Sequence, residues 1–450
     1  MQNHDKNLTT GPIIPLIWQS AWPMMLSIFF YTLYSIVDTF WVSKISTDAI
    51  AAVSISQVAL FIMISLSMGM AVGSSVVMGM HIGAKQKEQA EKVLGQSFVI
   101  ATIMAVFFTV LSLIFREPFL QASGAIGTIY APALIYFTIS AAGSILFFYL
   151  INIMFAFNSE GDTLTLTKLF ALSTVVNIGL DPLLIFGYGP IPAMGIAGAA
   201  YATLISQLIF IIISLKVLSG ADRAVQFSFK NICYMPASVK RILNIGVPAA
   251  LTQVVNPIGL ALLISIVSAT FAEPGATAFS LIFRLEMFAY IPAIGFGMAA
   301  MAMIGQSIGA GNFERAMEVF KKASLMGFAS ATVLGLLLML GGRFIIGAFT
   351  TDALVMQYSL SYLFIVAGTY GFLAVGMVVS SVFQAIGKSW PGFWLFFIKF
   401  LLFAVPLSYG ATQYFNLGIW SVWVIIAVSN LALAVGGYLW LRQSLLKTQS

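Results

Sequence analysis

Long apolar runs dominate this sequence and limit what it can fold into. Twelve of them follow one another, each about 20 residues or longer, the length that an α-helix needs to cross the hydrocarbon of a membrane. A membrane β-barrel would instead show alternating segments of about 10 residues. We therefore predict an all-α polytopic membrane protein with twelve transmembrane helices. The runs are 13–42, 48–79, 93–115, 130–154, 163–187, 193–218, 241–270, 276–305, 316–341, 355–381, 390–413 and 417–442.

The composition excludes several other classes of protein. Hydrophobic residues make up 60% of the chain and charged residues 8%, against roughly 25% charged residues in a soluble domain. The first run is too long for the apolar part of a signal peptide, so we expect it to stay in the mature protein. A single cysteine, Cys233, and two histidines, His4 and His81, provide neither a disulfide framework nor a Cys- or His-rich metal site.

The chain repeats itself at an offset of about 226 residues. "SIGAGNFERAMEVFKK" at 307–322 echoes "HIGAKQKEQAEKVLGQ" at 81–96, and Gly387 in "AIGKS" corresponds to Gly161 in "SEGDT". Six runs lie in each half, an even number, so the two halves have the same orientation and the repeat is parallel. Transporters built this way bind substrate between their halves and alternate access. The predicted parts are an N-terminal lobe, 1–218, a cytoplasmic linker, 219–240, and a C-terminal lobe, 241–450.

Lysine and arginine fall mainly on one side of the predicted membrane. Sixteen lie in connections on the side of the two termini, and three, Lys44, Arg116 and Arg343, lie in connections on the other side. The positive-inside rule therefore predicts that both termini are cytoplasmic. The net charge of +6 follows from this orientation, so we expect no nucleic-acid partner.

Two aspartates inside spans, Asp38 in the first and Asp181 in the fifth, are the main candidates for a functional site. An intramembrane carboxylate is costly and marks a functional site by default. Both lie at a similar depth below the outer ends of their helices. Tyr34 and Asn177 each precede an aspartate by four residues and so share its helix face. The sixth span adds Thr203, Tyr201 and Gln207.

The internal repeat provides a control for this interpretation. In the second half, Asn177, Asp181, Asp38 and Thr203 correspond to Phe403, Leu407, Leu263 and about Ile426. A residue that only builds the shared architecture should be polar in both halves, so the asymmetry favours a function specific to the first. The alternative is that both aspartates are packing residues, one of them protonated and hydrogen-bonded to Asn177 or a carbonyl.

The identity of a bound cation stays open at this point. Two neighbouring carboxyls would bind and release a proton as a unit, and the oxygens of Asp38, Asn177, Asp181 and Thr203 would equally surround Na⁺. Pro23 and Pro182 weaken the helical hydrogen-bond ladder and are candidate hinges, although prolines in membrane helices often only kink them.

Three further charges lie within spans of the second half: Arg284, Glu286 and Lys399. Arg284 and Glu286 are two residues apart and so lie on different helix faces. Glu286 and Lys399 both fall near the middle of their spans, which suggests a pair. Such a pair would either hold the eighth and eleventh helices together or take part in substrate or proton handling.

These features together resemble the multidrug and toxic compound extrusion (MATE) transporters. The resemblance lies in "VDTFWVSKIS…AAVSIS", "NIGLDPLLIFG…GIAGAAYATLISQ" and "IGAGNFERA", and it covers essentially the whole chain. It is greatest to the DinF-like branch, which implies a protonation site at Asp38 within one hydrogen-bond network with Asn177, Asp181 and Thr203.

The related NorM-type branch relies on acidic residues in helices 7 and 10. This chain departs from that pattern, because it has Gln253 and Asn256 in its seventh span and no acid in its tenth.

The resemblance implies a cation-coupled antiporter, with H⁺ favoured and Na⁺ as the alternative, that exports cationic amphipathic compounds by alternating access. The expected location is the inner (cytoplasmic) membrane of a bacterium or archaeon, and the expected partners are small organic substrates and membrane lipids, with a monomeric chain and no cofactor besides the coupling ion. One alternative is a flippase for lipid-linked or polysaccharide precursors, which would need more Arg in its cleft. An intramembrane enzyme would need a nucleophile or metal motif, so we predict that the chain is not an enzyme.

Overall fold

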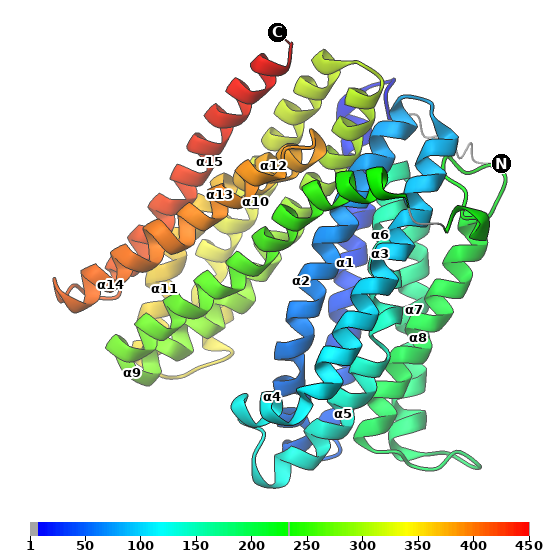
Figure 1. Ribbon diagram of the computed structural model, residues 1–450. Coiled ribbons are helices and arrows are strands. Elements are labelled where there is room, and N and C mark those ends of the chain that lie inside the picture. The colour runs from blue at the N-terminus through cyan, green and yellow to red at the C-terminus, as the bar shows by residue number, and fades with distance from the viewer. Residues whose placement is uncertain (1–7, 233–234, 450) are drawn as a thin grey trace. The chain divides into compact units, whose positions relative to one another are not determined.

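Helices make up most of the computed structural model, which describes residues 8–232 and 235–449 (Figure 1). His4 and Cys233 lie outside the described residues. The first half contains α1 (Ile13–Ser43), α2 (Thr47–Gly83), α3 (Lys87–Ile114), α4 (Arg116–Ala122), η1 (Gly127–Ile129), α5 (Tyr130–Ala142), α6 (Ser144–Glu160), α7 (Thr163–Phe186), α8 (Ile196–Leu218) and η2 (Phe229–Asn231). The second half contains α9 (Pro236–Gly309), α10 (Phe313–Gly347), α11 (Ala353–Val366), η3 (Ala367–Thr369), α12 (Tyr370–Ala385), α13 (Ser389–Phe397), η4 (Ile398–Ala404), α14 (Val405–Gln413) and α15 (Trp420–Gln449).

The helices correspond to the twelve predicted spans. Ten helical segments are long and apolar enough to cross a membrane by themselves. One of them, α9, is 74 residues long and has a non-helical residue, Ala272, near its middle, so it supplies the seventh and eighth spans. Helices α5 and α6 meet at an angle of 52° and together form the fourth. Counted in this way, the described part of the chain has twelve spans, as predicted.

The repeat extends to the turns between helices. Gly161 after α6 and Gly387 after α12 have φ angles of 78° and 76°, the left-handed conformation in which glycine has no steric penalty. The turns after α2 and α9 correspond in the same way, with Lys85 at φ 58° where the second copy has Gly311 at φ 73°. The two copies therefore share a backbone even where one of them uses a residue that is strained by it.

Contacts between residues divide the chain into two compact units. The first unit contains Leu26–Ala250, and the second contains Leu8–Met25 together with the chain from Leu251 onward. Helices α1 and α9 therefore each contribute to both units. The predicted lobes, 1–218 and 241–450, stay a prediction based on the repeat.

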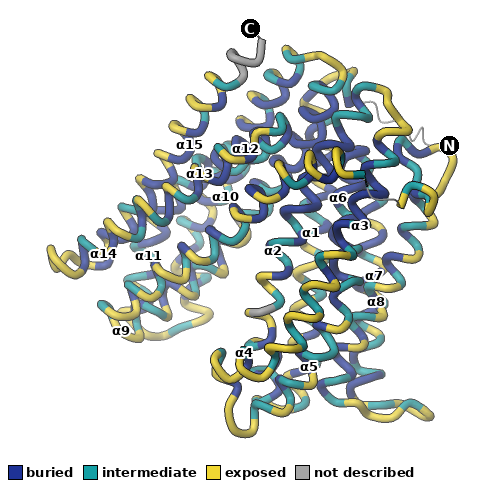
Figure 2. Tube along the Cα trace, viewed as in Figure 1, coloured by how far each residue is buried: buried dark blue, intermediate teal, exposed yellow. Residues whose placement is uncertain are grey.

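Exposed residues recur along the helices of both units (Figure 2), and many of them are large and apolar. Phe107 and Val175 in the first unit are 60% and 66% exposed, and Leu340 in the second is 85% exposed. Extensive apolar surface of this kind marks contact with lipid or with another protein, and in helices of spanning length it agrees with a multi-pass membrane protein.

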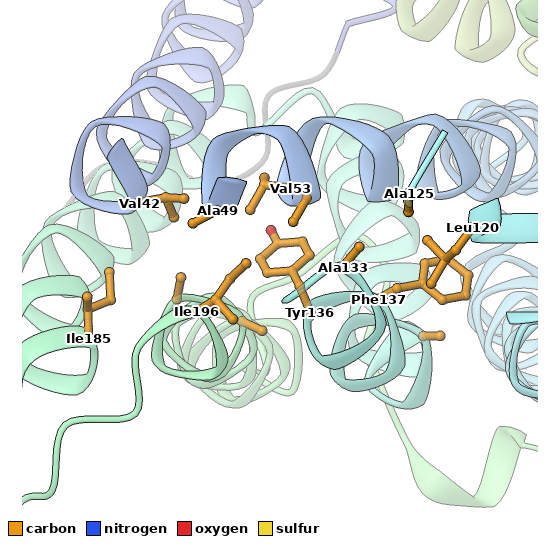
Figure 3. Packing of buried hydrophobic residues seen from close by; sticks show 14 residues of the cluster. Val42, Ala49, Val53, Leu120, Ala125, Ala133, Tyr136, Phe137, Ile185 and Ile196 are labelled. Atoms are coloured by element: carbon orange, nitrogen blue, oxygen red, sulfur yellow. The ribbon is translucent and has the colours of Figure 1, made fainter. Parts of the chain in front are cut away.

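A buried apolar cluster in the first unit joins helices α1, α2, α4, α5, α7 and α8 (Figure 3). Val42 of this cluster lies one helical turn after Asp38, and Ile185 lies one turn after Asp181. Because residues four apart share a helix face, the cluster continues directly from the two aspartates. Tyr136 of α5 also belongs to it, and its hydroxyl is polar.

Candidate functional site

Helices α1 and α7 are linked by hydroxyl groups before they reach the two aspartates. The hydroxyls of Ser27 and Thr167 are hydrogen-bonded at 2.9 Å. Farther along both helices, the Thr174 hydroxyl donates to the carbonyl oxygen of Phe30 at 3.4 Å. Both contacts advance in the same direction along the two helices, so α1 and α7 run parallel and carry Asp38 and Asp181 into the same region.

The two aspartates are deeply buried and close together. Asp38 is 5% exposed and Asp181 is 0% exposed, and their carboxyls are near enough to interact electrostatically. The Asn177 amide nitrogen donates to Asp181 Oδ1 at 3.1 Å, from one turn earlier on α7. The structure therefore groups the two carboxyls with this amide.

Two tyrosines complete the group. The Tyr34 hydroxyl lies beside the Thr203 side chain of α8 and within electrostatic range of both carboxyls. Tyr136 of α5 is also within range of both carboxyls, and sequence reasoning missed it. The internal repeat would have identified it, because Tyr362 occupies the corresponding position in the second half. We call Asp38, Asp181, Asn177, Tyr34, Tyr136 and Thr203 the carboxyl site.

The carboxyl site contains polar atoms that the protein leaves without hydrogen bonds. Among the described residues, Asp38 Oδ1, Asn177 Oδ1, Asp181 Oδ2 and Tyr34 Oη are buried and have no partner. A buried polar atom left in this state costs about 1–3 kcal/mol. Three of these four atoms can only accept a hydrogen bond or a cation, unless a carboxyl is protonated. The chemistry of the site therefore suits a proton, a donor-bearing molecule or a metal cation.

Other predicted residues of the first unit are less closely associated with the site. Tyr201 is 44% exposed, and it lies about half a turn from Thr203, on another face of α8. Gln207 is partly buried, and its Oε1 has no hydrogen-bond partner. Pro182 follows Asp181 within α7. Pro23 lies within α1 but in the part that belongs to the second unit.

The second unit has a polar group of its own, formed around Glu286. The Tyr362 hydroxyl donates to Glu286 Oε2 at 3.0 Å. Lys399 of η4 interacts electrostatically with Glu286, and each of the two residues is 6% exposed. Arg284 is exposed, as expected from its position on another face of α9. The structure thus brings Glu286 and Lys399 into one region and leaves Arg284 outside it.

A third charged group, which sequence reasoning missed, attaches the linker to the first unit. Arg223 of the linker is 7% exposed and forms ion pairs with Glu160 at 3.1 Å and Asp162 at 2.5 Å. Burial raises the pKa of Asp162, but hydrogen bonds from Arg223 and Thr165 more than offset this effect, and the resulting pKa is below the ordinary value. The carboxylate form of Asp162 is therefore stabilised in the folded protein.

Comparison with known proteins gives matches along nearly the whole chain. The profile of the MatE family matches residues 23–183 and 248–410. The FAD transporter of Shewanella oneidensis is 26% identical over 431 residues, which cover 96% of this chain and 95% of that protein. The probable multidrug resistance protein YoeA of Bacillus subtilis is 27% identical over 425 residues, which cover 91% and 90%. The crystal structure of MATE in the bent conformation is similar with a TM-score of 0.92 at 26% identity, covering 100% of this chain and 98% of that one.

The family profile matches twice, once in each half, in agreement with the internal repeat. The matched segments begin at Pro23 and Pro248, which are corresponding positions of the two copies. Members of this family are transporters and not enzymes. The chain belongs to the MatE family of multidrug and toxic compound extrusion transporters.

Proposed function

We propose that the protein exports small cationic amphiphiles in exchange for a cation that binds at Asp38 and Asp181. The observation that carries this proposal is the set of buried, unpartnered oxygens around two adjacent carboxyls. Two carboxylates in a medium of low dielectric constant repel each other strongly. Binding of a cation relieves the repulsion, so a coupling ion and a cationic substrate would compete for the site, and this competition is what exchange requires.

We propose H⁺ as the coupling ion, with Na⁺ as the alternative. A metal cation such as Ca²⁺ collects six or more oxygens around itself, whereas a proton needs a single carboxyl oxygen. Asp181 Oδ1 already accepts a hydrogen bond from Asn177, which leaves few oxygens for a metal. A proton shared within the carboxyl pair fits the observed partners with less rearrangement.

Exchange can be measured with purified protein in proteoliposomes, as uptake of a cationic dye driven by an imposed pH or Na⁺ gradient. Asp38→Asn should abolish pH-driven dye movement, and Asp222→Asn, which changes an exposed aspartate of the linker, should leave it intact. Full exchange by Asp38→Asn would refute the proposal. Exchange that requires Na⁺ and ignores the pH gradient would assign the site to Na⁺.

The names of the relatives bear on the substrate class. YoeA is named as a probable multidrug resistance protein, which agrees with export of varied small organic compounds and does not favour a flippase. The relative from S. oneidensis is named as a FAD transporter, and FAD carries phosphate groups. We also propose that the protein lies in the inner membrane as a monomeric chain with cytoplasmic termini. The distribution of Lys and Arg supports the orientation of the termini.

A further inference from the structure

Lys399 and Arg223 are the two buried cations among the described residues. Unlike Arg223, Lys399 has no hydrogen-bond or ion-pair partner within this part of the chain. Arg223 forms two ion pairs at 3.1 Å or less. The Lys399 ammonium lies 4.7 Å from the ring centroid of Phe400 and forms no hydrogen bond or ion pair with any residue in 8–232 or 235–449. The three N–H groups of this ammonium therefore have no hydrogen-bond acceptor among the described residues, and Glu286 interacts with it only electrostatically.

Three tyrosines lie within electrostatic range of Glu286, the acid that also interacts with Lys399. Tyr290, Tyr362 and Tyr370 all lie close enough to Glu286 to interact with it electrostatically. Tyr362 donates to Glu286, but the Tyr370 hydroxyl is buried without a hydrogen-bond partner, in a residue that is 1% exposed. We call Lys399, Glu286, Tyr290, Tyr362 and Tyr370 the lysine site. The polar groups of the lysine site that have no hydrogen-bond partner are mainly donors, whereas those of the carboxyl site are mainly acceptors.

The charged residues that distinguish the lysine site from the carboxyl site lie on corresponding spans of the repeat. Lys399 lies in the span that corresponds to α7, at the position of Ser173, and Asp181 corresponds to Leu407. In the second copy this span contains a π-helical segment, η4, whereas α7 is α-helical throughout. A π-helical turn inside an α-helix is rare and frequently marks a functional site. Each unit thus carries a buried charge on the same span, negative in the first unit and positive in the second.

We propose that the lysine site binds one oxyanion group, a carboxylate or a phosphate, of a transported amphiphile. Lys399 supplies the positive charge, the Tyr370 hydroxyl supplies a second donor, and Glu286 balances the charge of Lys399 while the site is empty. The Phe400 ring beside the ammonium provides an apolar wall for the remainder of the molecule. This inference rests on the proposed function in one respect, namely that the anionic group belongs to a molecule that the protein transports.

The proposal is tested by binding of rhodamine B, which has a free carboxylate, and of rhodamine B ethyl ester, in which that carboxylate is masked. Both dyes are titrated against purified protein in nanodiscs, and the ratio of their dissociation constants is compared between variants. Charge-assisted hydrogen bonds are worth tenfold or more in affinity. Lys399→Met should therefore reduce the preference for the free carboxylate about tenfold or more. Lys321→Met, which removes an exposed lysine of the same unit, should not change it.

The double variant with Glu286→Gln and Lys399→Met distinguishes an oxyanion site from a structural charge pair. It leaves no unpaired buried charge, so its fold is retained if Lys399→Met by itself is unstable. Under the proposal it still lacks the carboxylate preference. A double variant that regains the preference, or a Lys399→Met variant with an unchanged ratio, would overturn the proposal.

A second measurement tests the lysine site independently of the proposed export of cationic compounds. The melting temperature of the purified protein is followed with benzoate, with its neutral analogue benzamide, and with inorganic phosphate. We expect benzoate or phosphate to stabilise the wild-type protein but not Lys399→Met, and the more effective ion identifies the preferred group. No stabilisation of the wild-type protein by either anion contradicts the lysine site. If rhodamine B ethyl ester does not bind but benzoate raises the melting temperature of the wild-type protein, the proposed cationic substrate class is refuted. The lysine site is then still supported.

Discussion

Tyr136 and Tyr362 occupy the same position in the two copies of the repeat, 226 residues apart, and each interacts electrostatically with buried acids of its own unit. Tyr362 donates to Glu286, and Tyr136 lies within electrostatic range of Asp38 and Asp181. A tyrosine at this position is therefore common to both copies of the repeat, whereas the acids with which it interacts differ between the units.

Replacing these tyrosines with phenylalanine should have different effects in the two units. Tyr362→Phe removes a donor from a buried carboxyl, which costs about 1–3 kcal/mol, so the melting temperature of the purified protein should fall. Tyr136→Phe should reduce proton-coupled exchange with a smaller effect on stability, because no hydrogen bond of Tyr136 to the acids is lost. Equal melting temperatures for Tyr362→Phe and the wild-type protein would contradict the structural role of the Tyr362 hydrogen bond.

Lys85→Gly should stabilise the protein. Lys85 has a left-handed backbone at φ 58°, which costs a residue with a side chain about 1 kcal/mol or more relative to glycine. The matched change in the other copy, Gly311→Ala, should destabilise the protein for the same reason. Thermal unfolding of both variants tests the pair, and the interpretation fails if the two shifts have the same sign.

Arg223→Met should destabilise the first unit strongly. The change leaves Glu160 and Asp162 without their cation, and loss of one partner from a buried ion pair typically costs about 3–5 kcal/mol. Denaturation of the purified protein, followed by the accessibility of the linker to a protease, measures the effect. Lys230→Met, which changes an exposed linker residue, serves as the control and should be neutral.

The same contact predicts how stability depends on pH. Because the pKa of Asp162 is lowered in the folded protein, its contribution is present above the ordinary value of about 3.9 and is lost as the pH falls through the lowered value. The stability difference between the wild-type protein and Arg223→Met should therefore narrow as the pH is lowered below about 4. A difference that stays constant over this range would exclude Asp162 as its source.

Gly198→Ala should disturb the carboxyl site through the backbone. A Cβ atom at Gly198 on α8 would come within 2.4 Å of the Leu184 carbonyl oxygen on α7, so the two helices would have to separate. Overpacking of this kind typically costs about 1–3 kcal/mol, and α7 carries Asn177 and Asp181. We expect lower exchange and a lower melting temperature. Gly179→Ala on α7, where a Cβ would meet open space, is the matched control.

The spans and the proximity of the residues of the carboxyl site, except Tyr136, could be predicted from the sequence because both depend on local features. An apolar run of spanning length is a helix in a membrane, since its backbone groups must be satisfied internally. Buried aspartates are conspicuous in such runs, and residues four apart share a helix face, which associated Asn177 with Asp181 and Tyr34 with Asp38. The structure also places Thr203 beside Tyr34, as its depth in the sixth span suggested.

Features that depend on packing between distant segments could not be predicted in this way. The break at Ala272 falls in the predicted gap between the runs 241–270 and 276–305, beside Pro274 and Gly275. The π-helical segment η4 was not predicted, although Pro406 lies just after it. Arg223 lies in a polar linker where any charge is expected, and only the fold brings it to Glu160 and Asp162. Tyr201 was grouped with Thr203 by depth, but the helical rotation between them points it elsewhere.

The paired turns at Gly161 and Gly387 also bear on the history of the chain. They lie at corresponding positions and have nearly the same left-handed backbone, as expected after duplication of an ancestral six-helix gene. Asn177 and Asp181, in contrast, stand opposite Phe403 and Leu407. The backbone of the turns is thus common to the two copies, whereas the polar residues of the corresponding spans differ, and so does the backbone where η4 stands opposite α7.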